Sequence, residues 1–333
     1  MILIAVIFLI FFFIFIKNHE KISKLYNLYD SPFSQIKSHK NQVPITGGIF
    51  FMLSLILYSS ILIYLKENNY VIFDNIYFFR NLRDFIAFNI VALLFFLIGV
   101  FDDKYNLSAN YRLFFFTFFT YLLITLDNSI LINKIEFTNF DFKIYLNQFS
   151  LFFTILCFLI FINSLNMIDG INGFASFYVI IFATSILIKV PSIFLFKILI
   201  FVMIFFLYLN LKNKSFMGDG GSYLIGFLLS YIVIKLKLYG FLTNENIIIL
   251  MILPVIELLR VASNRVLMGK HPFVGDQNHI HHKLLKYFSL YKTLLILTFI
   301  TYTPVVINFF THMFFLPLIL FLVIYVFIIF KFN

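Results

Sequence analysis

Four polar segments interrupt an otherwise apolar chain, and each carries side chains that could bind a cation or a phosphate. The first is the adjacent pair Asp102-Asp103, which follows an apolar run. Two neighbouring carboxylates at the C-terminal end of a helix repel each other and oppose the helix dipole. Mg²⁺ bound to a substrate phosphate is their natural partner, because this ion prefers one or two carboxylates together with substrate oxygens. A solvated helix terminus is the alternative interpretation.

The second segment lies in mid-chain between two apolar runs. Asn163, Asn166 and Asp169 are spaced three residues apart, so they would share one face at the end of a helix. Gly170 and Gly173 would let the backbone turn tightly and approach a ligand. A carboxylate at the edge of a bilayer is costly and indicates a functional site, although it could instead cap free backbone N–H groups.

The third segment is the glycine-rich turn 218–222, which opens another apolar run. Such turns present backbone N–H groups to phosphate where a helix begins, and Asp219 adds a hard oxygen ligand beside them. The segment is not a P-loop, because the Lys-Ser/Thr pair and a preceding strand are missing. Considered alone, it could be a plain turn. Asn210, at the end of the preceding run, is predicted to help position the same bound group.

The fourth segment contains the histidines His279, His281 and His282, with Asp276 shortly before them. The three imidazoles could bind zinc, but no cysteine or closely spaced carboxylate accompanies them. Phosphate binding is therefore the favoured interpretation, and a surface histidine cluster is the alternative. In the first polar loop, Lys40 could attract a nucleotide phosphate or a lipid headgroup, or could simply reflect the charge bias of cytoplasmic loops.

The elements that must position these segments are strongly apolar. Hydrophobic residues make up 62% of the 333 positions, charged residues only 12%, and the mean hydropathy is +0.99. Continuous apolar runs indicate a polytopic helical membrane protein and not a β-barrel. We predict a single all-α domain, residues 1–333, with about eleven transmembrane helices, ten being the alternative count. The predicted spans are 1–16, 47–65, 84–101, 112–126, 148–162, 174–189, 193–209, 222–238, 246–262, 292–310 and 314–331.

The distribution of basic residues predicts the orientation of these spans. The loops after the odd-numbered spans, counted with the adjoining span ends as residues 17–46, 102–112, 210–221 and 260–292 and the C-terminal tail from Lys331, contain 16 of the 25 Lys and Arg residues. Positive residues accumulate on the cytoplasmic side, so we expect the N-terminus outside and the C-terminus inside. All four polar segments then fall on the cytoplasmic face, as one site assembled from alternate loops.

Other features limit the class of protein. The first apolar run has no basic start and no small-residue cleavage site, so we expect a retained helix and not a cleaved signal peptide. Cys157 is the only cysteine, which excludes an intramolecular disulfide and a cysteine metal site. The net charge of +10 has no soluble domain to carry it. We therefore expect membrane lipids and phosphorylated substrates as partners, and no nucleic acid.

Between about residues 40 and 290, the sequence resembles one family, the polyprenyl-phosphate N-acetylhexosamine-1-phosphate transferases of the MraY/WecA superfamily. Each motif alone is weak, whereas the set in this order is highly specific. The family moves a sugar 1-phosphate from a UDP-sugar onto undecaprenyl phosphate and releases UMP. The matching motifs are Pro44-Ile45-Thr46-Gly47-Gly48, Asp102-Asp103, Asn163-x-x-Asn166-x-x-Asp169-Gly170, Gly218-Asp219-x-Gly221-Ser222 and Pro272-Phe273-x-x-Asp276-x-x-His279-x-His281-His282.

The resemblance also implies roles for individual residues and a location. The active site should face the cytoplasm in the bacterial cytoplasmic (inner) membrane, in a multi-pass protein that could form a homodimer. Mg²⁺, with Mn²⁺ as the alternative, should bind Asp219 and Asp169. The implied catalytic residues are Asp102, Asp103, Asp169 and His281. The implied substrate-binding residues are Lys40, Arg112, Asn163, Asn166, Asn210, Asp276, His279 and His282.

Two alternative functions stay open beside this interpretation. The predicted span count and the histidine segment look more like the branch that begins O-antigen, teichoic acid or glycan-linker synthesis. Asn106 departs from the peptidoglycan branch, which transfers phospho-N-acetylmuramoyl-pentapeptide and is the alternative within the family. A polytopic transporter is the alternative from another class, but its charges should lie near mid-membrane on discontinuous helices. The identity of the sugar is left open among N-acetylhexosamines.

Overall fold

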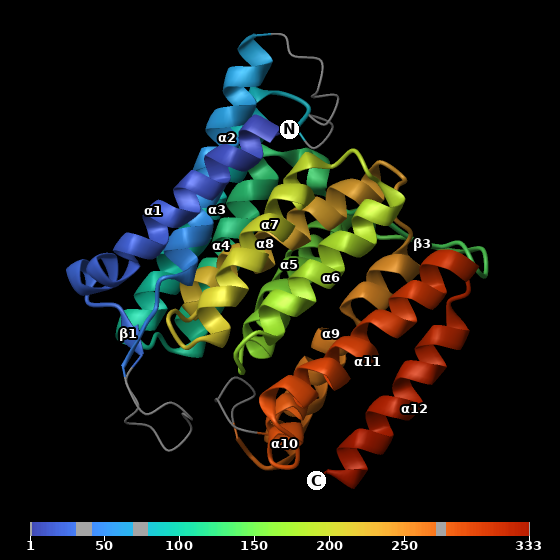
Figure 1. The fold of residues 1–333 in the computed structure, drawn as a ribbon. Helices are drawn as coiled ribbons and strands as arrows, with labels where there is room; N and C mark the ends of the chain where they lie inside the picture. The colour runs from blue at the N-terminus through green and yellow to red at the C-terminus, as the bar shows by residue number, and fades with distance from the viewer. Residues whose placement is uncertain (1, 31–41, 69–78, 271–277, 333) are drawn as a thin grey trace.

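The computed structural model describes residues 2–30, 42–68, 79–270 and 278–332, and these parts of the chain are mostly helical (Figure 1). The short strands β1 (Tyr29–Asp30) and β2 (Val43–Pro44) pair antiparallel, as do β3 (Lys134–Phe137) and β4 (Phe142–Tyr145). Two 3-10 helices are η2 (Asn128–Ile130) and η3 (Asn147–Phe149). The α-helices are α1 (Ile2–Tyr26), α2 (Gly47–Glu67), α3 (Leu82–Tyr105), α4 (Ala109–Leu126), α5 (Ser150–Ile168), α6 (Phe174–Lys189), α7 (Phe194–Leu211), α8 (Gly218–Leu238), α9 (Asn244–Leu267), α10 (Ile280–Leu285), α11 (Leu290–Thr311) and α12 (Phe315–Lys331).

Each of the eleven predicted spans coincides with one of these helices. Within the described ranges, nine helices are long and apolar enough to cross a membrane, and α6 and α12 are shorter apolar helices. The prediction of an all-α polytopic membrane protein is therefore confirmed, whereas the number of spans and their orientation stay predictions. Several helices extend beyond the predicted spans. The first helix continues to Tyr26, and Asp102 and Asp103 lie within the last turn of α3.

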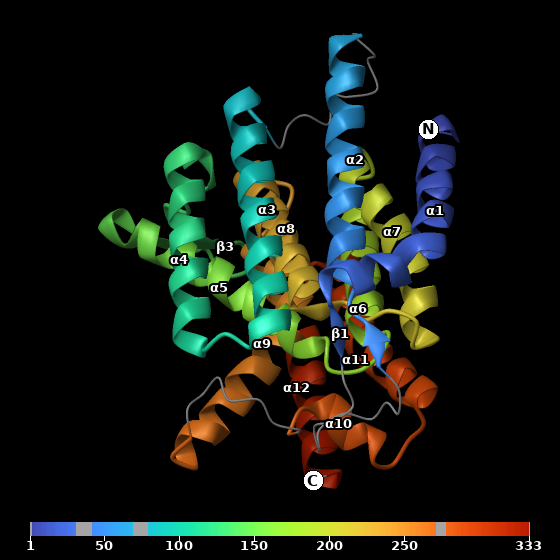
Figure 2. The ribbon, with the colours of Figure 1, turned by 90° about the vertical axis from the view of Figure 1, so that its left-hand side faces the viewer.

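Helix α8 forms the centre of the bundle. Its side chains are buried continuously from Gly220 to Leu236, and it packs against α2, α3 and α5. A helix that is apolar on all sides is expected to lie inside a bundle and not at its surface. Both views place α10 and the C-terminal end of α12 at the same end of the bundle as β1 (Figures 1 and 2).

The N-terminus of α8 contacts its neighbours backbone to backbone. A Cβ atom added at Gly99 of α3 would lie 2.4 Å from the carbonyl oxygen of Asp219. A Cβ atom at Gly48 of α2 would lie 2.6 Å from the backbone nitrogen of Gly221. Such distances leave room only for hydrogen, so glycine at these two positions allows the three helices to meet.

The backbone before α2 continues this contact. Phe216 N donates to Pro44 O at 2.9 Å, and Gly47 N donates to Phe216 O at 3.0 Å. The hydroxyl groups of Thr46 and Ser215 are buried and lie 2.8 Å apart. The motif 44–48 is thus paired with the segment that leads into the glycine-rich turn, and it fixes the position of that turn.

We expect Gly99→Ala to lower the free energy of unfolding by about 1–3 kcal/mol, because the added methyl group overpacks the contact with the Asp219 carbonyl and separates α3 from α8. Thermal unfolding of the purified chain in detergent measures the loss. Leu97→Ala is the control, since this side chain on the same helix is exposed. Equal unfolding midpoints for the wild type and Gly99→Ala would contradict the close helix contact.

Candidate active site

The structure brings the four polar segments together. The first segment contacts the third through Asp103 and the backbone of Asp219. The second contacts the third through Asn166, and it contacts the fourth where Gly170 lies against the ring of His281. The meeting point is formed by the C-terminal ends of α3 and α5, the N-terminal end of α8, and α10.

Asp103 caps α8 from a different helix. Its carboxylate accepts hydrogen bonds from Asp219 N at 2.8 Å and from Gly220 N at 3.1 Å. The first backbone N–H groups of a helix have no partner inside the helix, and a negative charge beside them is favourable. Asp103 therefore fixes the N-terminus of α8 against α3 and thereby positions Asp219. The catalytic role that the resemblance implies for Asp103 stays a prediction.

Asp102 is buried and receives hydrogen bonds from three places. The Tyr223 hydroxyl donates to its Oδ2 at 2.6 Å, Leu107 N donates to its Oδ1 at 2.8 Å, and Arg112 Nη1 lies 3.4 Å from its Oδ2. The same Arg112 nitrogen lies 3.5 Å from the Tyr223 oxygen. The carboxylate is thus oriented by donors from α4, α8 and the loop between α3 and α4. Tyr223 was not predicted as a site residue, and its only signal in the sequence is its position directly after the glycine-rich turn.

Asn166 joins α5 to α8. Its Nδ2 donates to Asp219 Oδ1 at 2.5 Å and to Ser222 Oγ at 2.9 Å. Asn163, one helical turn earlier, donates to the Leu159 carbonyl at 2.7 Å within its own helix. Although Asn163 and Asn166 lie one helical turn apart, they make different contacts, and the Asn166 amide is the one that orients Asp219.

Asp169 directly follows α5 and is half-buried. Within the described residues, its carboxylate accepts no hydrogen bond. Burial, and then repulsion from Asp219, raises the pKa of Asp169 well above its usual range. A cation bound between the two carboxylates would relieve this repulsion.

The donor chemistry of Asp169 and Asp219 fits a hard divalent cation. The described residues include no group of three or more His, Cys, Asp or Glu side chains that could hold a metal ion. Mg²⁺ does not need such a group, because one or two carboxylates and the oxygens of substrate phosphates complete its coordination. Mn²⁺ accepts the same hard oxygen donors.

Asn210 is buried at the end of α7 and links two turns. Its Oδ1 accepts from Gly173 N at 2.6 Å, and its Nδ2 donates to Ser215 O at 3.1 Å. Gly173 has φ +86°, a backbone conformation that favours glycine. Asn210 thus positions the turn after α5 relative to the segment before α8, and its predicted contact with a substrate stays a prediction.

His281 is buried against the turn after α5. A Cβ atom at Gly170 would lie 2.2 Å from His281 Nε2. The ring of His281 stacks on that of His279 at a centroid distance of 5.3 Å, and the His282 ring lies 4.4 Å away. Burial and the neighbouring histidines lower the pKa of His281 well below its usual range, so its ring is neutral. Neither ring nitrogen has a hydrogen-bond partner within the described residues, so this buried imidazole is unsatisfied there.

Glu257 positions the histidine segment, and it was not predicted as a site residue. Its carboxylate accepts hydrogen bonds from Ile280 N at 2.7 Å, from Arg260 Nη2 at 2.6 Å and from the Tyr325 hydroxyl. His279 Nδ1 lies 3.5 Å from its Oε1. Residues from within α9 and α12 and the first residue of α10 therefore meet at one buried carboxylate. The available signal was an acid and a base one helical turn apart within an apolar run.

Two of the predicted site residues, Lys40 and Asp276, lie outside the described residues. The same is true of Pro272 and Phe273 of the fourth motif. The remaining predicted residues all lie in described segments, and Arg112 joins them through its contact with Asp102.

Comparisons with known proteins match the region that contains most of these residues. The model of "Glycosyl transferase family 4" matches residues 85–237, which include the first three polar segments. Undecaprenyl-phosphate alpha-N-acetylglucosaminyl 1-phosphate transferase of Escherichia coli O157:H7 is 24% identical, over 80% of this chain and 71% of the relative. The protein of that name in Thermotoga maritima is 27% identical, over 80% of this chain and 76% of the relative. A probable undecaprenyl-phosphate N-acetylglucosaminyl 1-phosphate transferase of Bacillus subtilis is 29% identical, over 60% of this chain and 58% of the relative.

We expect Tyr223→Phe to cost about 1–3 kcal/mol of unfolding free energy, because the buried Asp102 carboxylate loses a donor while the ring keeps its packing against Phe116. Chemical unfolding in detergent measures the change, with Tyr121→Phe at an exposed position of α4 as the control. In an Asp102→Ala background the cost of Tyr223→Phe should shrink, because the acceptor is gone. Strictly additive effects of the two substitutions would contradict a direct role of this hydrogen bond.

We expect Glu257→Gln to loosen the histidine segment, because the charge that Arg260 and the Ile280 amide contact is removed. Amide hydrogen exchange at residues 278–285 should become faster by about tenfold or more, because the segment opens more easily when one charge-assisted hydrogen bond is weakened. Exchange at the N-terminus of α8 should not change, and Glu20→Gln at an exposed position is the matched control. Unaltered exchange at residues 278–285 would show that Glu257 does not position this segment.

Proposed function

We propose that this chain belongs to glycosyl transferase family 4 and transfers an N-acetylhexosamine 1-phosphate from a UDP-sugar to undecaprenyl phosphate, with release of UMP. The observation that supports this most is the junction of α3, α5 and α8. There Asp103 caps the helix that carries Asp219, and Asn166 orients the Asp219 carboxylate. The names of the related proteins support undecaprenyl phosphate as the acceptor and make UDP-N-acetylglucosamine the first donor to test.

The reaction is a phosphoryl transfer, and the residues suit its requirements. An oxygen of the lipid phosphate attacks the β-phosphorus of the UDP-sugar, and the bond from this phosphorus to UMP breaks. Catalysis of such a step rests on positioning and on neutralising the charge of the phosphate oxygens. Arg112 supplies a positive charge beside Asp102, which is oriented to accept a proton from the lipid phosphate or to position it.

Mg²⁺, or alternatively Mn²⁺, is the proposed cofactor, with Asp219 and Asp169 as its ligands. When bound, such an ion screens the phosphate charge and stabilises the UMP leaving group. The chain prepares these ligands in two ways. Asn166 restricts the Asp219 carboxylate, and the turn that holds Asp169 is placed by the contact of the next residue, Gly170, with the buried ring of His281.

The histidine segment is proposed to bind the diphosphate and the sugar. A neutral imidazole can donate one hydrogen bond and accept another. Because His281 is neutral and has no hydrogen-bond partner within the described residues, it can satisfy an oxygen of the donor substrate without first breaking an internal contact. The bias of Lys and Arg toward one set of loops supports an active site that faces the cytoplasm of the bacterial inner membrane.

The test is UMP release by detergent-purified protein with undecaprenyl phosphate, Mg²⁺ and a panel of UDP-N-acetylhexosamines. Release should require both the lipid and the metal, and a chelator should abolish it. The preferred donor would identify the sugar. A folded protein that binds the lipid but releases no UMP from any donor would count against the transfer and reopen the transporter interpretation.

Asp219→Asn should lower kcat by about 100-fold or more in this assay, because a ligand that stabilises transition-state charge is lost. Asp141→Asn is the matched control, since Asp141 is 93% exposed and lies in the turn between β3 and β4. Near-normal turnover by folded Asp219→Asn protein would remove Asp219 from the proposed metal site.

A further inference from the structure

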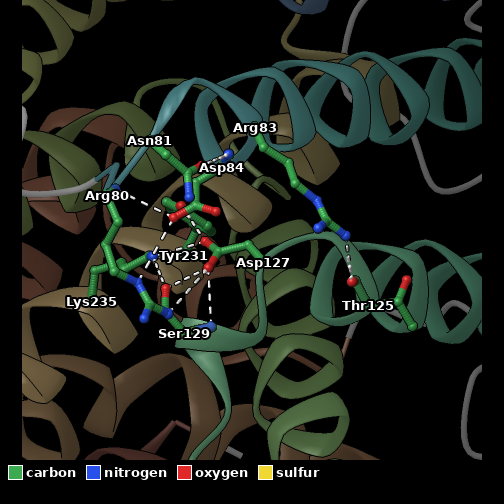
Figure 3. A network of polar contacts seen from close by, with 9 residues as sticks. All are labelled: Arg80, Asn81, Arg83, Asp84, Thr125, Asp127, Ser129, Tyr231 and Lys235. Atoms are coloured by element: carbon green, nitrogen blue, oxygen red, sulfur yellow. Dashed lines mark hydrogen bonds and ion pairs between the residues drawn. The ribbon is translucent and has the colours of Figure 1, made fainter.

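A second polar network lies at the opposite ends of the helices that carry the candidate active site (Figure 3). Asp84 is in the first turn of α3, Asp127 follows α4, and Lys235 lies in the last turn of α8. At about 1.5 Å per residue, Lys235 is about 24 Å along α8 from Asp219. The network is therefore distinct from the candidate active site, although it shares helices with it.

The centre of this network is a buried ion pair. Lys235 Nζ lies 2.8 Å from Asp127 Oδ2, and both side chains are almost completely buried. The Tyr231 hydroxyl also donates to Asp127 Oδ2, at 2.8 Å, and the Ser129 hydroxyl contacts both Asp127 and Lys235. The hydrogen-bonding needs of the Asp127 carboxylate are thus met by the donors Lys235, Tyr231 and Ser129.

Arg80 is bound much more loosely. Its side chain is about half exposed, and with the described residues its guanidinium makes only long ion pairs, 3.8 Å to Asp84 and 3.8 Å to Asp127. A guanidinium has five N–H donors in a planar arrangement that matches the oxygens of a phosphate. Within the part of the chain that the structure describes, most of the hydrogen-bonding capacity of Arg80 therefore stays free for another anion.

Arg80 and Lys235 line a cavity of about 370 Å³ at this end of the bundle. Two amide side chains, Asn128 and Asn133, also face it, and one wall is apolar, formed by Leu131 and Leu238. Among the described residues that line the cavity there is no carboxylate. Both acids of the network are buried behind the lining, so an anion in the cavity would meet cations and amides first.

We propose that this cavity binds a phosphate group, carried by an anionic lipid headgroup or present as free phosphate. Arg80 would provide the charge-assisted contacts, and the neighbouring amides would add neutral donors. The volume lies in the range of small-molecule sites. The cavity lies where the candidate spans α4 and α8 end, which is where the headgroups of a surrounding bilayer would lie. The apolar wall suits the first carbon atoms of a lipid. This inference does not depend on the proposed transferase activity.

The experiment is a calorimetric titration of the purified full chain in detergent. The probes are short-chain dihexanoyl phosphatidylglycerol, dihexanoylglycerol, which lacks the phosphate, and inorganic phosphate. We expect saturable binding of the phospholipid and none of dihexanoylglycerol. Arg80→Gln should weaken the binding about tenfold, because one charge-assisted hydrogen bond to the phosphate is lost.

Arg83→Gln is the matched control. Arg83 is exposed like Arg80 and lies in the first turn of α3. Its guanidinium donates to the carbonyl of Thr125 and points away from Asp127 (Figure 3). Binding by this variant should equal that of the wild type. Lys235 is a poor choice for substitution, because its removal leaves Asp127 charged and unpaired inside the protein. Unchanged thermal unfolding of Arg80→Gln would show that the variant is folded.

The outcomes separate the two sources of phosphate. Binding of phosphatidylglycerol that depends on Arg80 identifies a lipid headgroup, whereas Arg80-dependent binding of inorganic phosphate alone identifies the free anion. The proposal is overturned if neither phosphate probe binds, or if dihexanoylglycerol binds as tightly as the phospholipid. Equal weakening by Arg80→Gln and Arg83→Gln would also overturn it, because the effect would then come from diffuse surface charge.

Discussion

The carboxylate of Asp103 at the N-terminus of α8 is the contact on which the rest of the site depends. The first N–H groups of this helix are partly buried, where glycines of α2 and α3 leave no room for larger side chains. Asp103 satisfies two of these N–H groups from the end of α3. Because Asp219 directly follows the glycine that begins α8, the same contact fixes where its carboxylate lies.

The candidate site consists of two parts that are stabilised separately. One part is the junction of α3, α5 and α8, where Asp102, Asp103 and Asp219 converge. The other is the histidine segment, whose position depends on Glu257 and its partners from α9 and α12. The two parts meet where His281 lies against Gly170. Any side chain at position 170 would separate them, which explains why a glycine follows Asp169.

Helix α8 connects the two ends of the molecule. At one end it carries Asp219, which accepts a hydrogen bond from Asn166 of α5. It also carries Tyr223 there, whose hydroxyl donates to Asp102 of α3. At the other end it carries Tyr231 and Lys235, which bind the carboxylate that follows α4. Buried ion pairs are costly to break once formed, so this second network fixes the helices against sliding along one another. A rigid central helix in turn keeps the carboxylates of the candidate site in a constant geometry.

The sequence by itself determined the helices and the polar segments that meet at the candidate site, because both signals are local. Apolar runs predict spanning helices from composition alone, and the spacing of Asp102-Asp103, Asn166, Asp169, Asp219 and the histidines indicated phosphate and metal chemistry. Only the tertiary structure decided which side chains act on which. Asp103 and Asp219 are 116 positions apart, and Tyr223 lies 121 positions from Asp102, so no periodicity could predict either contact. Likewise Glu257 and the cavity beside Arg80 depend on groups from separate helices that come together only when the bundle packs.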